Sequence, residues 1–550
     1  MVHARGVADD LPERRGPASP PPAGPGADRG RRAADPSRAE RWRGALAGVL
    51  AAALTLGVAQ LLAGLTDASS APLSAVGDAF IDLTPAWLKD VAIAVFGVHD
   101  KTALLVGAVL VLAVLAALVG VVAVRRPRLG TLAVVALGAV GAVAAATRAD
   151  AGPLAPLPAL LGAAAGVVAL GRLAPRAAAP AGTTGRTSAG RPGAGGVDRR
   201  SFLGGALVVG GLAAITALGG VGAGAARGGA AAARALVRLP APAQAAVALP
   251  PEAAAPVDGV VPVVTPNETF YRIDTAFVVP DVDPAGWELR VHGLVEQEVR
   301  LTWDELLASE LVEAWVTLTC VSNTVGGDLA GNARWLGLPV REVLARARPL
   351  PGADMVLSTS SDGFTASTPL EALTDDRDAL LAVGMNGEPL PPAHGFPVRM
   401  VVPGLYGYVS ATKWVVDLEV TRFAERSAYW TQRGWSERGP VKTASRIEVP
   451  RQGATLPAGT VAVGGTAWAQ HRGITGVEVQ VDDGPWQPAT LAGEISVDTW
   501  RQWSFAWHAA PGDHLLRVRA SDPDGPQTGD RVGAVPDGAT GWHEVAVRVA

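Results

Sequence analysis

The chain has 550 residues, a formal net charge of −4 and a single cysteine. This length allows about three or four domains, the nearly balanced charge predicts no nucleic-acid partner, and a lone cysteine excludes an intrachain disulfide. Hydrophobic residues make up 49% of the chain and the mean hydropathy is +0.25, which is high for a purely soluble protein. We therefore expect part of the chain to be associated with a membrane.

The first 250 residues are typical of a membrane anchor. Residues 1–43 are rich in Arg, Pro, Ala and Gly, which predicts a disordered cytoplasmic tail. Residues 44–176 then contain four uncharged apolar runs, each close to the about 17–25 residues that cross a bilayer, and we predict a four-helix transmembrane region. The runs lie at 44–65, 102–124, 129–146 and 151–171. Buried helices of a soluble core are the alternative, but the lack of charge within such long runs favours membrane spans.

A fifth apolar run extends from Ser201 to Ala226 and completes a segment, 177–226, that begins as a basic loop. Within it, the sequence from Asp198 to Leu203 (Asp-Arg-Arg-Ser-Phe-Leu) resembles a twin-arginine export signal, which directs folded and often cofactor-loaded proteins across the membrane. Residues 227–256 are rich in Ala and Pro, and we interpret them as a linker.

Most arginines that flank the predicted spans lie on one side of them, and the loops on the other side are poor in Arg. These arginines are Arg41, Arg43, Arg125, Arg126, Arg128, Arg172, Arg176, Arg186, Arg191, Arg199 and Arg200, whereas the other loops carry Asp67, Asp78, Asp82, Asp90 and Asp150. Because positive charge prefers the cytoplasmic side, we predict a multi-pass protein of the cell membrane with five spans and everything after about residue 230 extracytoplasmic. The nearly charge-free spans argue against a transporter.

Residues 257–440 change to short strands, short helices and turns, which predicts an α+β domain. Thr302 to Glu305 has the form of a capping box, so a short helix is expected there. An amphipathic helix is predicted over 338–347, and buried strands over 314–320 and 398–402.

Cys320 therefore ends a predicted strand and opens into a Gly-rich loop. Structural zinc needs four ligands, and the chain has no further cysteine. A cysteine nucleophile with His292 or His394 as its base is an alternative, although no protease-like pattern accompanies them.

Three sequence blocks resemble the sulfite oxidase family and occur in the family's order. Thr319-Cys320-Val321-Ser322-Asn323 is similar to its Cys-x-x-Asn segment. His394 to Gly404 (His-Gly-Phe-Pro-Val-Arg-Met-Val-Val-Pro-Gly) is similar to its pterin-binding segment and is followed by Lys413-Trp414. Pro266 to Arg272 resembles the first loop that contacts the cofactor. The likeness covers roughly residues 256–550.

The resemblance implies a molybdenum-cofactor oxidoreductase, with molybdopterin as cofactor and Cys320 as the protein's metal ligand. It implies catalytic roles for Cys320 and Arg272. It implies cofactor contacts for Phe270, Tyr271, Arg272, Asn323, Ser360, Asp362, His394, Arg399, Thr412 and Lys413. A dithiolene and one thiolate form a sulfur-rich ligand set, and an arginine can hold the cofactor phosphate through its fork of donors.

Residues 441–550 contain short alternating strands at a spacing that predicts an immunoglobulin-like β-sandwich. The sandwich resembles the C-terminal dimerisation domain of the same family, so the resemblance implies a homodimer. A generic sandwich module with packing tryptophans is the alternative.

Two departures from the family bear on the substrate. Asn323 is followed by Thr324-Val325 where animal and plant sulfite oxidases carry an anion-binding arginine, and Trp435 takes the place of their active-site tyrosine. Arg272 keeps the place of one substrate-side arginine. We therefore expect oxygen-atom transfer on a small-molecule substrate, such as reduction of an S- or N-oxide, with an unidentified electron donor or acceptor. Sulfite oxidation by the same site, or a cofactor-free membrane-tethered scaffold, are the alternatives.

Overall fold

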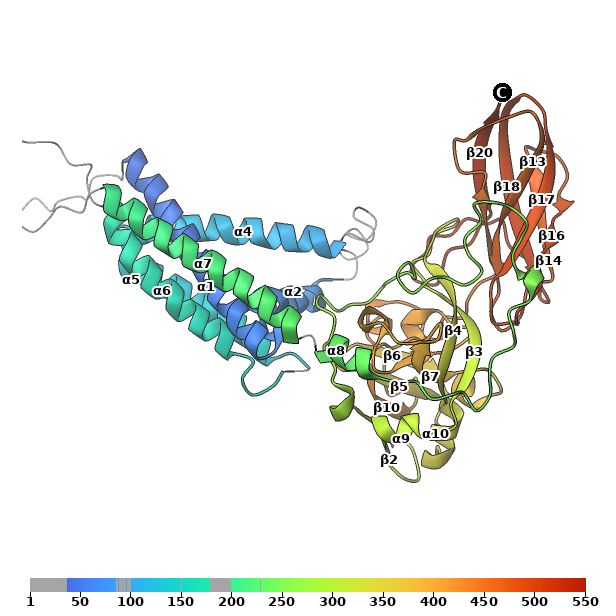
Figure 1. The fold of residues 1–550 in the computed structure, drawn as a ribbon, viewed down its shortest axis with the longest axis horizontal. Coiled ribbons are helices and arrows are strands. Elements are labelled where there is room, and N and C mark those ends of the chain that lie inside the picture. Colours follow the sequence, from blue (N-terminus) through green and yellow to red (C-terminus); the bar gives the residue numbers. More distant parts are fainter. Residues whose placement is uncertain are drawn as a thin grey trace, which may run out of the picture.

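The computed structural model describes residues 37–85, 88, 95, 100–149, 151–178, 199–227 and 229–550. Figure 1 shows a helical bundle at one end, a mixed part of helices and strands beside it, and a β-rich part that carries the C-terminus at the other end.

The bundle consists of long apolar helices. Among the described residues, five helices are long and apolar enough to cross a membrane, and they correspond to the five predicted runs. They are α1 (Arg38–Leu65), α4 (Asp100–Ala123), α5 (Pro127–Ala146), α6 (Leu157–Ala178) and α7 (Arg199–Arg227). A shorter helix, α2 (Pro72–Leu83), follows α1.

Small residues bring α1 close to its neighbours. A Cβ atom on Gly48 would lie 1.9 Å from the Ala116 carbonyl oxygen of α4, and one on Gly64 would lie 2.3 Å from the Gly220 oxygen of α7. Larger apolar side chains point outward: Leu207 is 78% exposed. Close backbone contact through small residues, with leucine and valine outside, is typical of helices that pack in a lipid environment.

Two boundaries of the bundle differ from the prediction. The tail was expected to end at residue 43, but α1 already begins at Arg38, because Ser37 and Glu40 form a capping box. The fourth run was expected from 151, but α6 spans Leu157–Ala178. Residues 1–36 of the tail, residues 179–198 of the basic loop and Asp198 of the twin-arginine-like segment lie outside the described residues.

Residues 229–550 are described without a gap, and their first part holds two five-stranded sheets. One has the order β2-β1-β10-β5-β6, and the other has the order β3-β4-β7-β8 with β9 on β7. The first is built from β1 (Glu288–Gly293), β2 (Val299–Thr302), β5 (Met355–Ser360), β6 (Thr365–Pro369) and β10 (Val415–Thr421). The second is built from β3 (Val312–Thr319), β4 (Ala330–Pro339), β7 (Leu380–Met385), β8 (Glu388–Pro389) and β9 (Arg399–Val401).

Short helices cover the edges of this mixed part. Helix α9 (Trp303–Leu307) begins with the predicted capping box of Thr302 and Glu305. Helix α10 (Val340–Ala347) begins two residues later than predicted, because residues 338 and 339 still belong to β4. Both helices contribute to a shared core, in which Leu306 and Val343 are fully buried.

The segment predicted as a linker is packed against the mixed part. Residues 229–236 form α8 (Gly229–Leu236), whose first amides, on Gly229 and Ala230, donate to the Asp281 carboxylate. Further along, Gln244 pairs with Val312 at the edge of β3. A carboxylate at the helix start and a strand edge explain why this stretch is ordered.

The C-terminal part is formed by two sheets that share one core. The first has the order β11-β13-β17-β16, and the second has the order β12-β20-β18-β14-β15 with β19 on β18. The strands are β11 (Ala444–Val449), β12 (Thr455–Leu456), β13 (Gly459–Trp468), β14 (Gly476–Val481), β15 (Gln487–Pro488), β16 (Thr490–Leu491), β17 (Arg501–Ala509), β18 (Gly512–Asp522), β19 (Gly525–Pro526) and β20 (His543–Val549). Val463 and Trp503 of one sheet pack with Val479 and Val518 of the other.

This part also supports β3 of the mixed part. The Thr317 amide of β3 donates to the Asp498 carbonyl oxygen at 3.0 Å, and the Gln470 amide donates to the Thr317 carbonyl oxygen at 3.0 Å. The Trp500 backbone amide donates to the Thr317 hydroxyl at 2.8 Å. These buried bonds fix the strand whose end carries Cys320.

Candidate functional site

Cys320 is the first residue after β3 and is 9% exposed. Its amide donates to the Leu329 carbonyl oxygen at 2.9 Å, and its own carbonyl oxygen accepts from the Asn323 amide at 3.1 Å. The Asn323 side-chain oxygen accepts from the Leu329 amide at 2.9 Å. Asn323 therefore closes the loop that presents the thiol.

The thiol lies in a site that disfavours its charge. Burial raises the pKa of Cys320, and hydrogen bonds from Ser322 and the charge of Lys413 only partly oppose this effect. Two tyrosines interact electrostatically with a Cys320 thiolate. Burial, and then the thiolate charge, raise the pKa of Tyr271. Burial and the same charge also contribute to raising the pKa of Tyr406 to about 12. A metal that binds this thiol has to displace its proton.

Three potential cofactor ligands meet around the turn before β9. A 3-10 turn (Pro392–His394) ends at Gly395, which has φ 109°. A Cβ atom on Gly395 would lie 2.9 Å from Arg399 Cβ and 3.2 Å from Lys413 Cα. Glycine is needed both for the left-handed backbone at this position and because Arg399 and Lys413 pack closely against its Cα atom.

Arg399 is a buried cation. It is 4% exposed, and its guanidinium donates to the backbone carbonyl oxygens of His394, Met400 and Ala411. Its ring contact is with Trp335, at 5.1 Å. Within the described ranges it has no ion pair with a carboxylate, and burial lowers its pKa to about 10. An isolated buried charge is costly, so this position suits an anionic ligand.

Lys413 has a carboxylate partner that the sequence analysis did not identify. Its Nζ lies 2.9 Å from Asp274 Oδ2, and Asp274 also contacts Arg272 Nε at 3.0 Å and Lys101 Nζ at 2.7 Å. Burial would raise the pKa of Asp274, but the charges of Lys413 and Lys101 hold it well below its usual range. Burial lowers the pKa of Lys413 to about 8, although Asp274 opposes the change.

His394 is 5% exposed and neutral at pH 7. Burial, followed by the charges of Lys413 and Arg399, lowers its pKa to about 4. Nε2–H donates to the Asn267 carbonyl oxygen at 3.0 Å, and Nδ1 has no hydrogen-bond partner. The Phe270 ring lies edge-on to the imidazole at 5.6 Å.

The turn after β5 contributes further polar atoms. The hydroxyls of Ser360 and Ser361 are buried and have no hydrogen-bond partner. Thr412 is fully buried, but its hydroxyl is hydrogen-bonded to Ser358 at 2.7 Å, and Asp362 accepts from the Phe364 amide at 3.2 Å within the turn. The Thr412 hydroxyl and the Asp362 carboxylate therefore already have hydrogen-bond partners within the protein.

The residues present fit a molybdopterin. The buried cations suit its phosphate, and the unsatisfied atoms of Ser360, Ser361 and His394 suit a polar ring system. Within the described ranges, no group of three or more His, Cys, Asp or Glu side chains could hold a metal ion, so a metal bound by one thiol has to bring its other ligands with it. A cofactor dithiolene supplies such ligands.

The ten predicted cofactor residues thus differ in how they are placed around the site. Tyr271, His394, Arg399 and Lys413 lie near one another, whereas Arg272 is 40% exposed at its side chain and bonded to Asp274. Sequence reasoning missed Asp274, Ser361 and Trp335. Asp274 follows Arg272 closely in sequence, but nothing in the pattern shows that it faces Lys413.

Trp435 is packed among aromatic rings. It stacks on Trp430 at 4.1 Å, meets Tyr408 edge-on at 5.2 Å and is 7% exposed. It is part of the core of the mixed part.

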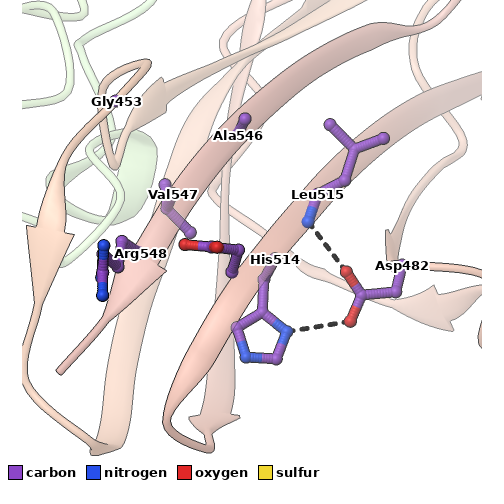
Figure 2. Close-up of a pocket in the computed structure, with 8 residues that line it drawn as sticks. Gly453, Asp482, His514, Leu515, Ala546, Val547 and Arg548 are labelled. Atoms are coloured by element: carbon purple, nitrogen blue, oxygen red, sulfur yellow. Dashed lines mark hydrogen bonds and ion pairs between the residues drawn. The ribbon is translucent and has the colours of Figure 1, made fainter.

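A hollow on the β-rich part contains none of these residues. Figure 2 shows residues that line it, with Asp482 bonded to the His514 ring at 2.8 Å and to the Leu515 amide at 2.8 Å. The lining is Gly453, Asp482, Asp513, His514, Leu515, Ala546, Val547 and Arg548. The Asp482 carboxylate already accepts hydrogen bonds from two residues of β18. We therefore interpret this hollow as a structural feature of the sheet and not as a catalytic site.

Comparison with known proteins also indicates a molybdopterin-binding oxidoreductase domain. A family model described as the oxidoreductase molybdopterin binding domain matches residues 276–430. The chain is 30% identical over 347 residues to mitochondrial sulfite oxidase of Homo sapiens, covering 52% of this chain and 62% of that protein. It is 31% identical over 180 residues to the uncharacterized oxidoreductase YuiH of Bacillus subtilis (strain 168), covering 32% of this chain and 87% of that protein.

The chain therefore spans less than two thirds of the sulfite oxidase that it matches. Among solved structures, the sulfane dehydrogenase SoxCD from Paracoccus pantotrophus is similar, with a TM-score of 0.45, 22% identity and coverage of 55% of this chain and 89% of that chain.

Proposed function

The chain belongs to the sulfite oxidase family of molybdopterin-dependent oxidoreductases, and from this premise we propose that it is a membrane-anchored enzyme that transfers an oxygen atom to or from a small substrate. It is an enzyme of this family and its cofactor is the molybdenum cofactor. When bound, the cofactor supplies two-electron chemistry coupled to oxygen-atom transfer. The protein supplies the thiolate, the binding of the cofactor and the selection of the substrate.

Each part of the site has a proposed role. Cys320 is the protein ligand to molybdenum. Arg399 and Lys413 bind the cofactor's phosphate, since both are buried cations that can form charge-assisted hydrogen bonds. His394 and Ser360 bind its polar rings through atoms that have no partner within the protein.

The remaining predicted residues act more indirectly. Phe270 and Tyr271 stack on each other at 5.2 Å and form an aromatic wall beside His394. Asn323 shapes the Cys320 loop, and Thr412 and Asp362 shape the turns that carry the cofactor ligands.

We propose that the substrate is an S- or N-oxide rather than sulfite, and one observation carries this choice. The loop after Cys320, residues 321–329, has no Lys or Arg of its own. Arg446, which donates to the Gly327 carbonyl oxygen of this loop, is paired with Glu448, and Arg272 is paired with Asp274. A small, highly charged anion needs several fixed donors, each of which contributes on the order of 1.5–3 kcal/mol. A pocket with fewer cations suits a neutral oxide better. Its reduction consumes two electrons and two protons and releases water, so an electron donor is required.

The helical bundle supports a location in the cell membrane with the catalytic part outside. Five helices suit a multi-pass anchor, and the basic residues near the start of α1, the end of α4 and the end of α6 suit the cytoplasmic side. The part after residue 230 then lies outside, and Arg199-Arg200 is the export signal.

The arrangement of the strands supports a division of the extracytoplasmic part into two domains. We propose a catalytic domain over 257–440 and an immunoglobulin-like sandwich over 441–550 that forms a homodimer. The two sheets with a common core support the sandwich.

The test uses full-length protein, purified in detergent and loaded with molybdenum cofactor. Steady-state sulfite oxidation with a dye as electron acceptor is compared with reduction of sulfoxides and N-oxides with a reduced dye. We expect a higher kcat/KM for an oxide. A sulfite kcat/KM of about 10⁶ M⁻¹s⁻¹ or more, above that of every oxide, would show instead that the site oxidises sulfite, which is the second candidate because of the likeness to the human enzyme.

A further inference from the structure

The helical bundle contacts the mixed part at the edge of the cofactor site. Lys101, the second residue of α4, places its Nζ 2.7 Å from Asp274 Oδ1 and 2.5 Å from the Ala276 carbonyl oxygen. Asp78 of α2 accepts a hydrogen bond from the Phe277 amide at 3.1 Å. Two segments of the bundle therefore hold the same short loop, which also carries the carboxylate partner of Lys413.

Other contacts also join the bundle to the mixed part. A Cβ atom on Gly363, in the turn after Ser361, would lie 2.8 Å from Ala149 Cβ. Tyr429 Oη donates to the Asp82 carboxylate at 3.2 Å, and Arg433 donates to the Asp82 carbonyl oxygen at 3.2 Å. Figure 1 shows α2 at the junction between the bundle and the mixed part. The junction is thus broader than a single tether.

We propose that Lys101 is a positioning residue of the cofactor site, supplied by the membrane anchor. It compensates the charge of Asp274, so that Lys413 stays available to the anionic group of the cofactor. This inference rests on the proposal that Lys413 binds that group.

Lys101 acts through its charge. Asp274 is shared by three cations, Lys101, Arg272 and Lys413, and its side chain is 7% exposed. Solvent and salt screen such buried charges poorly. Without Lys101 the carboxylate is balanced by fewer cations, so it holds Lys413 more firmly and repels an incoming phosphate.

The experiment measures cofactor retention in the full-length holoenzyme in detergent. Release of the pterin is followed by its fluorescence after dilution, and molybdenum content is measured in parallel. Lys101→Met is expected to accelerate release about threefold to tenfold, which is less than the roughly tenfold to hundredfold of a direct charge-assisted bond because Lys101 acts on the cofactor only through Asp274 and Lys413. Lys101→Arg keeps the charge and is expected to restore slow release.

Lys442→Met is the matched control. Lys442 also pairs with a carboxylate, Asp537, at 3.1 Å. Only its backbone amide, which the substitution keeps, donates to Tyr406 near Cys320. This variant should release the cofactor at the wild-type rate. If Lys101→Met also does so, the inference is wrong.

A double-mutant cycle separates positioning from a general loosening of the junction. In an Asp274→Asn background, Lys101→Met should change the release rate by less than about twofold, because its partner is gone. An undiminished effect in that background would show that Lys101 acts without Asp274 and would overturn the proposal. A wild-type protein that holds cofactor but is insensitive to Lys101 overturns this inference alone, whereas absence of cofactor from the wild type overturns the proposed function.

Discussion

Lys413 and Asp274 form an ion pair with an N–O distance of 2.9 Å, although 139 residues separate them in the sequence. Their side chains are only 9% and 7% exposed. A buried lysine needs a counter-charge, and this carboxylate provides one when no other anion is bound. An anionic cofactor group that binds Lys413 therefore competes with Asp274.

Asp274→Asn should destabilise the cofactor-free protein more than the loaded one. Removing one partner of a buried ion pair costs about 3–5 kcal/mol, and a bound phosphate can take over the role of the lost carboxylate. The thermal midpoints of both forms, in detergent, give the comparison. An equal decrease in both forms would mean that Lys413 does not contact the cofactor.

Cys320→Ser should lower kcat at least about a hundredfold, because even residues that only support a metal ligand contribute about 10–100-fold. The electron paramagnetic resonance spectrum of the loaded protein should change as well, since an oxygen replaces sulfur at the metal. Pterin content should remain measurable, because the proposed contacts of Arg399 and Lys413 with the cofactor are unchanged in this variant. Turnover and a spectrum like those of the wild type would refute the assignment.

Much of this organisation was predictable from local sequence. The apolar runs predicted the five long helices, and the capping box at Thr302 predicted the start of α9. The β-branched run before Cys320 predicted β3. Each of these signals depends on neighbouring residues, so it can be recognised in a single sequence.

The rest depends on contacts between distant residues. No local pattern indicates that Lys101 and Asp274 meet, or that Ser361 has a buried hydroxyl without a partner. The contacts of the predicted linker are of the same kind, since they are made with Asp281 and the edge of β3. Likewise, the sequence around Trp435 does not indicate that its ring stacks on Trp430.

Acid should destabilise the cofactor-free protein through His394. Its pKa falls from 6.5 to about 4 on folding, because of burial and of the facing charges of Lys413, Arg399 and Arg272, which outweigh the hydrogen bond to Asn267. Between these values the unfolded chain binds the proton and the folded protein does not. Stability is therefore complete above about pH 6.5 and is lost as the pH falls towards 4, by roughly 3 kcal/mol in total.

His394→Gln removes this titration and is the matched variant. Other acidic groups titrate in both proteins, so the quantity of interest is the difference in their unfolding free energies as a function of pH. The stability of the wild type should fall more steeply from pH 6.5 to 4. Parallel curves would contradict a His394 that is held neutral by its surroundings.

Replacing Arg199 and Arg200 together by lysine should keep the C-terminal part inside the cell, because export by the twin-arginine route depends on the arginine pair. A protease added outside cells with an opened cell wall should digest this part in the wild type and spare it in the variant. A variant with Arg125 and Arg126 changed to lysine is the control and should behave as the wild type. Digestion of the Arg199/Arg200 variant would show that another route is used.

Thr324→Arg should shift the site towards sulfite. Thr324 is exposed on the loop after Cys320, beside Asn323, in the stretch that lacks basic residues. An added guanidinium supplies a charge-assisted donor of about 1.5–3 kcal/mol, which corresponds to roughly a tenfold to hundredfold change in affinity. We expect the KM for sulfite to fall by about that factor, while the KM for a neutral sulfoxide changes little. Thr324→Gln has a similar chain length without the charge and should leave both constants near those of the wild type. If Thr324→Arg and Thr324→Gln give the same KM for sulfite, the missing cation on this loop does not determine the choice of substrate.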